Sequence, residues 1–260
     1  MSFEITTELL ENISSYIEAS NDKAIIVLFE EMHHADIAEI IDDISFDDAV
    51  YLIKLLDSEK TSAILMELDE DIREKILQNL SAKEIAEEVD ELDSDDAADI
   101  IGELSEERQE AVMSQIIDEE HVREIEELLA YDENSAGSLM AKELVKVYEN
   151  WTVLKCVREM RAQAEEVTRV HSIYVVDDQD KLMGRLSLKD LLITSTKTAI
   201  SEVYIPKVDF VNVHDDLDEV SNKMRKYDLE AIPVVDDEGV LLGRITIDDI
   251  VDVIKEEMQM

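Results

Sequence analysis

The sequence predicts a multidomain protein in which an all-α, superhelical repeat domain is followed by an α/β part. Three observations predict this fold class: a helix-start signal that recurs every twelve residues in the first half, a duplicated block rich in β-branched residues in the second half, and only five glycines and two prolines in 260 residues. With 45% hydrophobic residues, a chain of this length can bury two or three ordinary cores.

The first half contains an apolar residue followed by Ser or Asp at regular intervals. The pairs are Ile44-Ser45, Leu56-Asp57, Leu68-Asp69, Leu80-Ser81, Leu92-Asp93 and Leu104-Ser105. Ser and Asp accept hydrogen bonds from the free amides of a first helical turn, so each pair marks a short helix, and Ser81 with Glu84 resembles a capping box. The segment ADIAEIIDDISFDDA from Ala35 is similar to KEIAEEVDELDSDDA from Lys83, 48 positions later. This repeat predicts stacked helical hairpins.

The second half is built on a duplication. The segment YDENSAGSLM, residues 131–140, ends the helical array with turn-forming residues. HSIYVVDDQDKLMGRLSLKDLL from His171 then matches EAIPVVDDEGVLLGRITIDDIV from Glu230, 59 positions later. Each copy predicts a strand, a turn, a strand and a helix that opens after Ser187 or Thr246. Upstream helices carry apolar stripes that we expect in the core: Val153, Val157 and Met160 in one copy, and Leu217, Val220 and Met224 in the other.

Charge is the most informative feature of the composition. The chain has 66 acidic and 24 basic side chains, a formal net charge of −42, which repels nucleic acid and predicts stabilisation by cations. Its single cysteine, Cys156, forms no disulfide within the chain and fits a reducing compartment. No apolar run approaches the ~18 residues of a membrane helix, and the N-terminus lacks a signal peptide, so the chain as given is expected to be soluble and not exported.

The last predicted helix, IDDIVDVIKEEM from residue 247, crowds acids on one face. Asp248, Asp252 and Glu256 are successive i, i+4 neighbours, which repel each other. Residues 59 positions earlier are Lys189, Ile193 and Lys197, so the fold itself does not require these acids. The opposite face, expected to be buried, carries Ile247, Ile250 or Val251, Ile254 and Met258.

The helical array contains a similar contrast. Asp95 and Asp96 recur 48 positions earlier as Asp47 and Asp48, whereas Asp99 corresponds to Tyr51. Asp95 and Asp99 therefore form an added i, i+4 acidic pair. Magnesium is the compensating ion that these oxygen ligands favour, although calcium or manganese could occupy the same oxygens.

The second half resembles a tandem pair of cystathionine-β-synthase (CBS) domains. The resemblance rests on the helix, strand, turn, strand, helix order, on the VVDDxGxLxG pattern and on the Ser/Thr-x-x-Asp helix start, and it covers residues 138–260. Asp180 replaces the turn residue Gly239 in the first copy, where a distorted turn is expected.

An acidic helical repeat domain joined by residues 131–140 to a CBS pair is similar to the cytosolic part of MgtE magnesium channels, over the whole chain. The expected domains are an acidic helical domain at 1–130, a linker at 131–137, CBS domain 1 at 138–200, and CBS domain 2 at 201–260 with the start of a connecting helix. The resemblance implies a homodimer through the CBS domains on the cytoplasmic side of the cell membrane. It also implies a membrane pore domain as partner in the full-length protein.

The same resemblance implies that magnesium bridges the helical and CBS domains, compacts the protein and favours pore closure. We expect residues 135–138 of the linker to supply the hinge for this movement. The implied ligands are Asp95, Asp99, Asp218, Asp228, Asp249, Asp252 and Glu257, and we add Glu256 because helical phase alone prefers it to Glu257.

CBS pairs often bind adenine nucleotides such as ATP. The candidate residues are Ser187, Lys189 and Asp190, since Lys189 suits phosphate whereas Asp248, at the equivalent place in the second copy, repels it. Two interpretations stay open, because Ser187 and Thr246 could serve only as helix caps.

No motif of an enzyme is present, so no catalytic residue is predicted. The alternative function is a CBS regulatory adaptor that responds to adenine nucleotide or a protein partner and whose acids serve only solubility.

Overall fold

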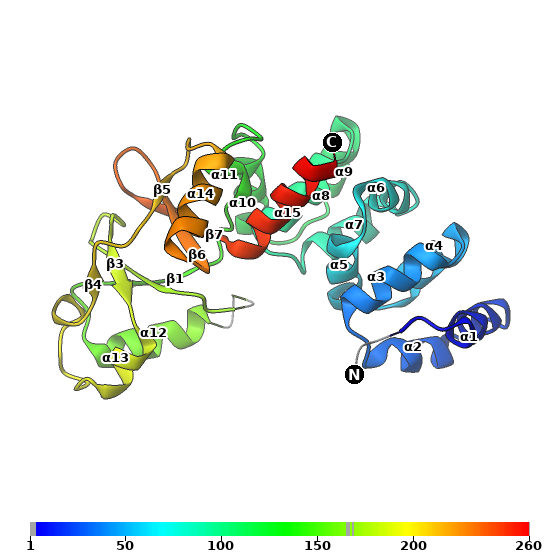
Figure 1. Ribbon diagram of the computed structural model, residues 1–260, viewed down its shortest axis with the longest axis horizontal. Coiled ribbons are helices and arrows are strands. Elements are labelled where there is room, and N and C mark those ends of the chain that lie inside the picture. The colour runs from blue at the N-terminus through cyan, green and yellow to red at the C-terminus, as the bar shows by residue number, and fades with distance from the viewer. Residues whose placement is uncertain (1–3, 165–166, 168, 260) are drawn as a thin grey trace. The chain divides into compact units, whose positions relative to one another are not determined.

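The computed structural model describes residues 4–164, 167 and 169–259; in the last helix it leaves out the side chains of residues 252 and 255–259. The chain forms two compact units (Figure 1). Unit 1 comprises the residues up to Leu92 together with Asp99–Val122. Unit 2 comprises Asp93–Ala98 together with the residues from Arg123 onward.

Unit 1 is a series of consecutive short helices, as the repeat predicts. Its elements are α1 (Thr7–Glu18), α2 (Asp22–Glu30), α3 (His34–Asp43), α4 (Phe46–Leu55), α5 (Ser58–Glu67), α6 (Glu70–Gln78), α7 (Ala82–Val89), the later part of α8 (Ser94–Gly102) and α9 (Glu106–Met113). Helix α3 packs on α5, α5 on α7 and α7 on α9, so every second helix is in contact, as in stacked hairpins. The stacking buries apolar residues of each helix, among them Ile37, Ile64 and Ile85.

Local hydrogen bonds explain where these helices begin. The side chains of Ser45, Asp57 and Ser81 each accept a bond from a backbone amide of the following first turn. The capping box of Ser81 and Glu84 is confirmed, because both of its reciprocal bonds are present.

Unit 2 contains the two CBS copies. Its elements are most of α10 (Glu119–Leu128), then α11 (Ala136–Leu139), β1 (Val145–Tyr148), α12 (Val153–Gln163), β2 (Ile173–Val176), β3 (Leu182–Leu186), α13 (Leu188–Ile193), the 3-10 helix η1 (Ile200–Glu202), β4 (Ile205–Pro206), β5 (Val211–Asn212), α14 (Leu217–Tyr227), β6 (Ala231–Val235), β7 (Leu241–Thr246) and α15 (Ile247–Gln259).

The two copies have matching sheets. One sheet has the order β1-β2-β3-β4 and the other β5-β6-β7, and in both the first pair is parallel and the next antiparallel. The register shifts at Val175/Val176 in β2 and at Val234/Val235 in β6, which are equivalent positions of the duplication. The predicted strand, turn, strand, helix order is therefore confirmed in both copies.

Three details differ from the sequence prediction. Val157 is 37% exposed, because Cys156 rather than Val157 turns into the core between Val153 and Met160. In α15, Ile250 is buried, whereas Ile247 and Ile254 are 38% and 40% exposed, so the predicted buried stripe is only partly covered in this chain. The turn at Asp180 is not distorted.

Asp180 adopts the same left-handed backbone as the equivalent glycine, with φ of 58° against 83° for Gly239. Aspartate tolerates this region better than most residues. The Asp180 carboxylate also accepts a bond from the hydroxyl of Tyr148 at 2.8 Å and pairs with the Lys146 ammonium at 3.3 Å.

Residues 131–140, which include the predicted linker and hinge, are packed against the second CBS copy. The amide of Ala136 donates to the carbonyl of Asp215 at 2.8 Å, and that of Gly137 donates to the carbonyl of Val213 at 2.9 Å. Ser135 and Ala136 are buried. Movement at residues 135–138 would therefore have to break these bonds. No described helix has the length and apolar character needed to cross a membrane.

Candidate metal site

Three carboxylates of unit 2 converge at the start of α8. One oxygen each of Asp93, Asp95 and Glu143 lie within 4.8 Å of one another, and all three residues are half-buried. Asp93 precedes α8, Asp95 lies in its first turn, and Glu143 lies between α11 and β1. The fold thus collects oxygen ligands from two segments that are far apart in sequence.

Glu143 is held by the N-terminus of α8. The amide of Ser94 donates to Oε1 of Glu143 at 3.0 Å, and the Ser94 hydroxyl donates to Oε2 at 2.9 Å. The Ser94 hydroxyl oxygen also accepts a bond from the amide of Lys142 at 2.9 Å. A carboxylate at a helix N-terminus is stabilised by the free amides and the helix dipole.

A buried arginine borders the same cluster. Nε of Arg244, in β7, donates to the carbonyl of Glu143 at 2.7 Å, and Nη2 donates to Oδ2 of Asp93 at 3.2 Å. Arg244 is only 6% exposed. Its guanidinium therefore joins the segment before β1 to the segment before α8.

Asp249 lies at the start of α15, directly after β7. Its Oδ2 accepts bonds from the amide of Thr246 at 2.7 Å and from the Thr246 hydroxyl at 2.8 Å. Burial raises the pKa of Asp249 above its ordinary value, and the two bonds from Thr246 oppose this shift.

Asp95 is the most perturbed carboxylate of the site. Burial raises the pKa of Asp95 well above its ordinary value. The negative charges of Asp96, Asp249 and Asp93 raise it further, in that order. Asp95 and Asp249, which the resemblance assigns to opposite sides of a bridging ion, are thus close enough for their charges to interact.

The remaining predicted ligands are spread over the chain. Asp99 is exposed in unit 1. Burial lowers the pKa of Arg73, but the hydrogen bond and charge of Glu103, followed by the smaller effect of the Asp99 charge, raise it above its ordinary value. Asp218 is exposed in the first turn of α14, and Asp228 is exposed at the left-handed C-cap of the same helix. Ten residues of helix separate these two by roughly 15 Å, so they cannot hold one ion together. The side chains of Asp252, Glu256 and Glu257 lie outside the described residues.

Sequence reasoning missed Glu143 and Arg244 and treated Asp93 only as a cap. Glu143 lies outside the two segments that the duplication aligns, which begin at His171 and Glu230, so the repeat does not single it out. Arg244 recurs as Arg185 in the other copy, and this Gly-Arg pair is visible in the sequence. The burial of one arginine and not of the other depends on tertiary contacts.

The predicted nucleotide residues form a helix start. The Ser187 hydroxyl accepts a bond from the amide of Asp190 at 3.4 Å, which is the capping interpretation. Lys189 is exposed.

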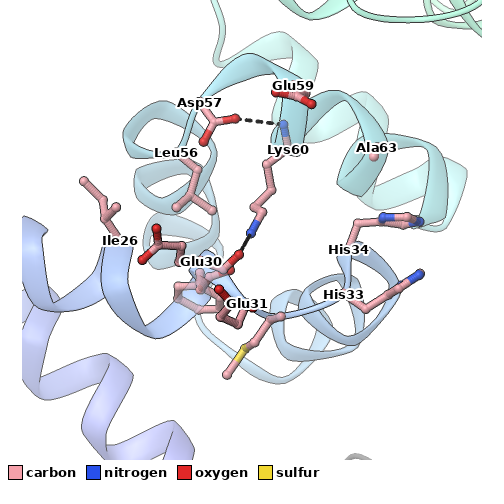
Figure 2. Close-up of a pocket in the computed structure, with 12 residues that line it drawn as sticks. Ile26, Glu30, Glu31, His33, His34, Leu56, Asp57, Glu59, Lys60 and Ala63 are labelled. Carbon is pink, nitrogen blue, oxygen red and sulfur yellow. Dashed lines mark hydrogen bonds between the residues drawn. The ribbon is translucent and has the colours of Figure 1, made fainter. Parts of the chain in front are cut away.

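Unit 1 has a separate concave site of about 650 Å³ (Figure 2). Its polar groups serve the fold: Lys60 Nζ donates to the carbonyls of Phe29 and Glu30 at 2.5 and 2.7 Å, at the end of α2. Nδ1 of His33 accepts a bond from the amide of Ala35 at 3.2 Å, which caps α3. Nε2 of His34 lies 3.4 Å from Oε1 of Glu67. These side chains are engaged in helix capping and in contacts within the helical array, so the carboxylate cluster is the stronger candidate site.

Comparison with known families agrees with this architecture. Residues 32–134 match the MgtE intracellular N domain, and residues 136–195 and 200–256 match the CBS domain. The fold and these matches define a CBS-pair protein with an MgtE-type N domain. The magnesium transporter MgtE of Thermus thermophilus is 42% identical over 134 residues, which are 52% of this chain and 30% of that protein.

Solved structures extend the similarity over nearly the whole chain. The cytosolic domain of the Mg²⁺ channel MgtE in complex with ATP is 31% identical with a TM-score of 0.87, covering 94% of this chain and 100% of that one. The soluble part of a magnesium transporter is 28% identical with a TM-score of 0.83, covering 96% and 98%. The chain belongs to the MgtE family. It spans about 30% of the length of the curated transporter that it matches.

Proposed function

We propose that this chain is the magnesium-sensing regulatory region of an MgtE-type magnesium transporter. Magnesium binds carboxylates at the start of α8 and of α15, draws the helical and CBS parts together and favours closure of the pore. The pore belongs to a membrane domain of the longer protein, and the chain works on the cytoplasmic side of the membrane.

The proximity of Asp95 to Asp93, Asp249 and Glu143 carries this proposal. Carboxylates this close repel one another, and a divalent cation relieves the repulsion. Magnesium prefers oxygen ligands, keeps several waters and needs only one or two carboxylates at a site. The residues present therefore fit this ion without a dense protein cage.

The net charge of −42 supports the same proposal. Such a charge opposes compaction when few ions are bound. Ions bound at Asp95 and Asp249 would remove part of this repulsion, and Asp99, Asp218, Asp228, Asp252, Glu256 and Glu257 are further ligands that we propose by family similarity.

We also propose a homodimer formed through the CBS domains. Helices α12 and α13 of the first copy share the core of Val153, Cys156 and Leu191, and they carry large apolar residues on their outer surface. These exposed residues are Leu154 (63%), Val157 (37%), Leu188 (59%), Leu192 (79%) and Ile193 (75%). A second copy of the chain presents the same surface, so a twofold contact would bury it on both sides.

ATP or another adenine nucleotide is a second ligand that we propose, because the related cytosolic domain was solved in complex with ATP. Ser187, Lys189 and Asp190 are the candidate residues. The alternative is a CBS adaptor that responds to nucleotide or a protein partner without sensing metal.

Titration calorimetry with magnesium tests the proposal. We expect Asp95→Asn to weaken magnesium binding on the order of tenfold, because the site loses one ligand charge. Asp47→Asn is the matched control, since Asp47 occupies the equivalent position 48 residues earlier and is exposed on α4. Equal magnesium binding by the two variants would contradict the proposed site, and binding of ATP but not magnesium would support the adaptor.

A further inference from the structure

The second CBS copy fixes the first turn of α8 through one buried cation. Arg244 bonds to the carbonyl of Glu143 and to the carboxylate of Asp93. Its backbone also exchanges two hydrogen bonds with Ala141, of 2.8 and 2.9 Å. β7, the segment before β1 and the turn before α8 are therefore joined at this residue.

The carboxylate of Glu143 also binds the first turn of α8. Ser94 is fully buried, and both its amide and its hydroxyl donate to the Glu143 carboxylate. Because the carbonyl of Glu143 accepts from Arg244, a displacement of Arg244 would also disturb the carboxylate that caps α8. The two sets of bonds form one continuous network.

The duplication supplies an internal control for this arginine. Arg185 occupies the position in β3 that Arg244 occupies in β7, yet Arg185 is exposed, whereas Arg244 is 6% exposed. The CBS fold thus does not require a buried arginine at this position. Arg244 combines this burial with its contacts to Asp93 and the carbonyl of Glu143.

A guanidinium stays charged at any pH at which proteins fold, and its planar fork can bind two oxygens at once. The cluster around it contains the carboxylates of Asp93, Asp95, Glu143 and Asp249. One positive charge offsets part of this negative charge and leaves an excess for a divalent ion.

We infer that Arg244 is a built-in counter-cation that holds the first turn of α8 against β7 when no magnesium is bound, and so positions Asp95 beside Asp249. This inference rests on the proposed magnesium site, to which it adds a positioning residue. Magnesium then binds carboxylates that are already close together, instead of having to assemble them. A site whose competent state is populated in advance binds its ligand with less loss of affinity.

Hydrogen exchange followed by mass spectrometry tests this role in the whole chain. In chelator, we expect Arg244→Gln to accelerate exchange of the amides of residues 94–98 about tenfold or more. Magnesium should restore slow exchange, because the ion supplies the missing positive charge. Arg244→Lys should give an intermediate rate, since an ammonium keeps the charge but not the two-pronged geometry.

Arg185→Gln is the matched control and should leave exchange at residues 94–98 unchanged. Peptides from β6 and the first part of β7 report whether the second CBS copy stays folded, and they should exchange at the parental rate in Arg244→Gln. Parental exchange at residues 94–98 in that variant would overturn the inference, as would equal acceleration throughout β6 and β7. If magnesium has no effect on the parent chain, the proposed metal site fails, whereas the comparison in chelator still decides the role of Arg244.

Discussion

At the scale of single residues, Glu88 in α7 is an acid whose surroundings oppose its charge. It is 6% exposed, and its carboxyl oxygens lie 2.8 and 2.7 Å from the hydroxyl of Thr61. The Thr61 hydroxyl also lies 3.0 Å from the carbonyl of Asp57. A protonated Glu88 can donate to Thr61 while Thr61 donates to that carbonyl, so the geometry accommodates the neutral acid.

Burial raises the pKa of Glu88 from 4.5 to about 7, and the charges of Glu87, Glu91 and Asp57 add to the rise. Between pH 4.5 and about pH 7 the Glu88 carboxyl therefore stays protonated in the folded state, whereas it is ionised in the unfolded chain. By linkage, Glu88 makes stability fall as pH rises through this window, and its full cost is present above about pH 7. Below pH 4.5 the cost is absent.

Glu88→Gln should remove this cost, because the amide keeps the size of the side chain and its bond to Thr61. We expect the variant to exceed the parent in free energy of unfolding by ~2–3 kcal/mol at pH 8, and by close to nothing near pH 4.5. Urea unfolding of both proteins at the two pH values measures the difference. A constant difference at both pH values would show that charge burial is not its origin.

At the scale of elements, helix caps were predictable because they are local. Ser45 and Ser81 cap their own helices within three residues, so the twelve-residue pattern locates the helix starts in unit 1. The network of Arg244 with Asp93 and Glu143 was not predictable, because its members are 50 to 151 positions apart in sequence and become neighbours only through the fold. Of the candidate site, the sequence therefore indicates individual acids but not their arrangement.

The C-terminus of α2 depends on a distant lysine. Lys60, in α5, donates to the carbonyls of Phe29 and Glu30, and a cation at this end also favours the helix dipole. We expect Lys60→Met to lower the free energy of unfolding by about 1 kcal/mol, as measured by urea unfolding. Lys23→Met is the control, because Lys23 is exposed in the first turn of α2 and should change stability little. Equal effects of the two substitutions would refute the capping role.

The segment that joins the helical array to the CBS copies is tightly packed around Gly137. A Cβ at Gly137 would lie 2.6 Å from the Tyr131 ring and 2.8 Å from Cγ2 of Val213. We expect Gly137→Ala to destabilise unit 2 by ~1–3 kcal/mol through overpacking.

Thermal unfolding compares this variant with Gly239→Ala. A Cβ at Gly239 meets nothing within 4 Å, so that substitution should cost only about 1 kcal/mol for a left-handed backbone with φ of 83°. If Gly137→Ala unfolds at the parental temperature, the segment is looser than its contacts indicate.

At the scale of the whole molecule, the apolar surface on α12 and α13 predicts self-association. Leu192 is 79% exposed, and Leu192→Asp would place a charge in the centre of the proposed contact. We expect sedimentation velocity at tens of micromolar to give a dimer for the parent and a monomer for the variant. Ile117→Asp is the control, because Ile117 is 89% exposed in unit 1 and should leave the dimer intact. A monomeric parent, with or without magnesium, would contradict the proposed dimer.

Magnesium sensing is the central claim, and small-angle scattering tests it most directly. The chain carries a net charge of −42, so an expanded form is favoured at low ion concentration. We predict a smaller radius of gyration in millimolar magnesium than in chelator, and no such change in sodium at matched ionic strength. An equal decrease in sodium would mean that simple screening accounts for the acidic surface, and would contradict a specific magnesium site.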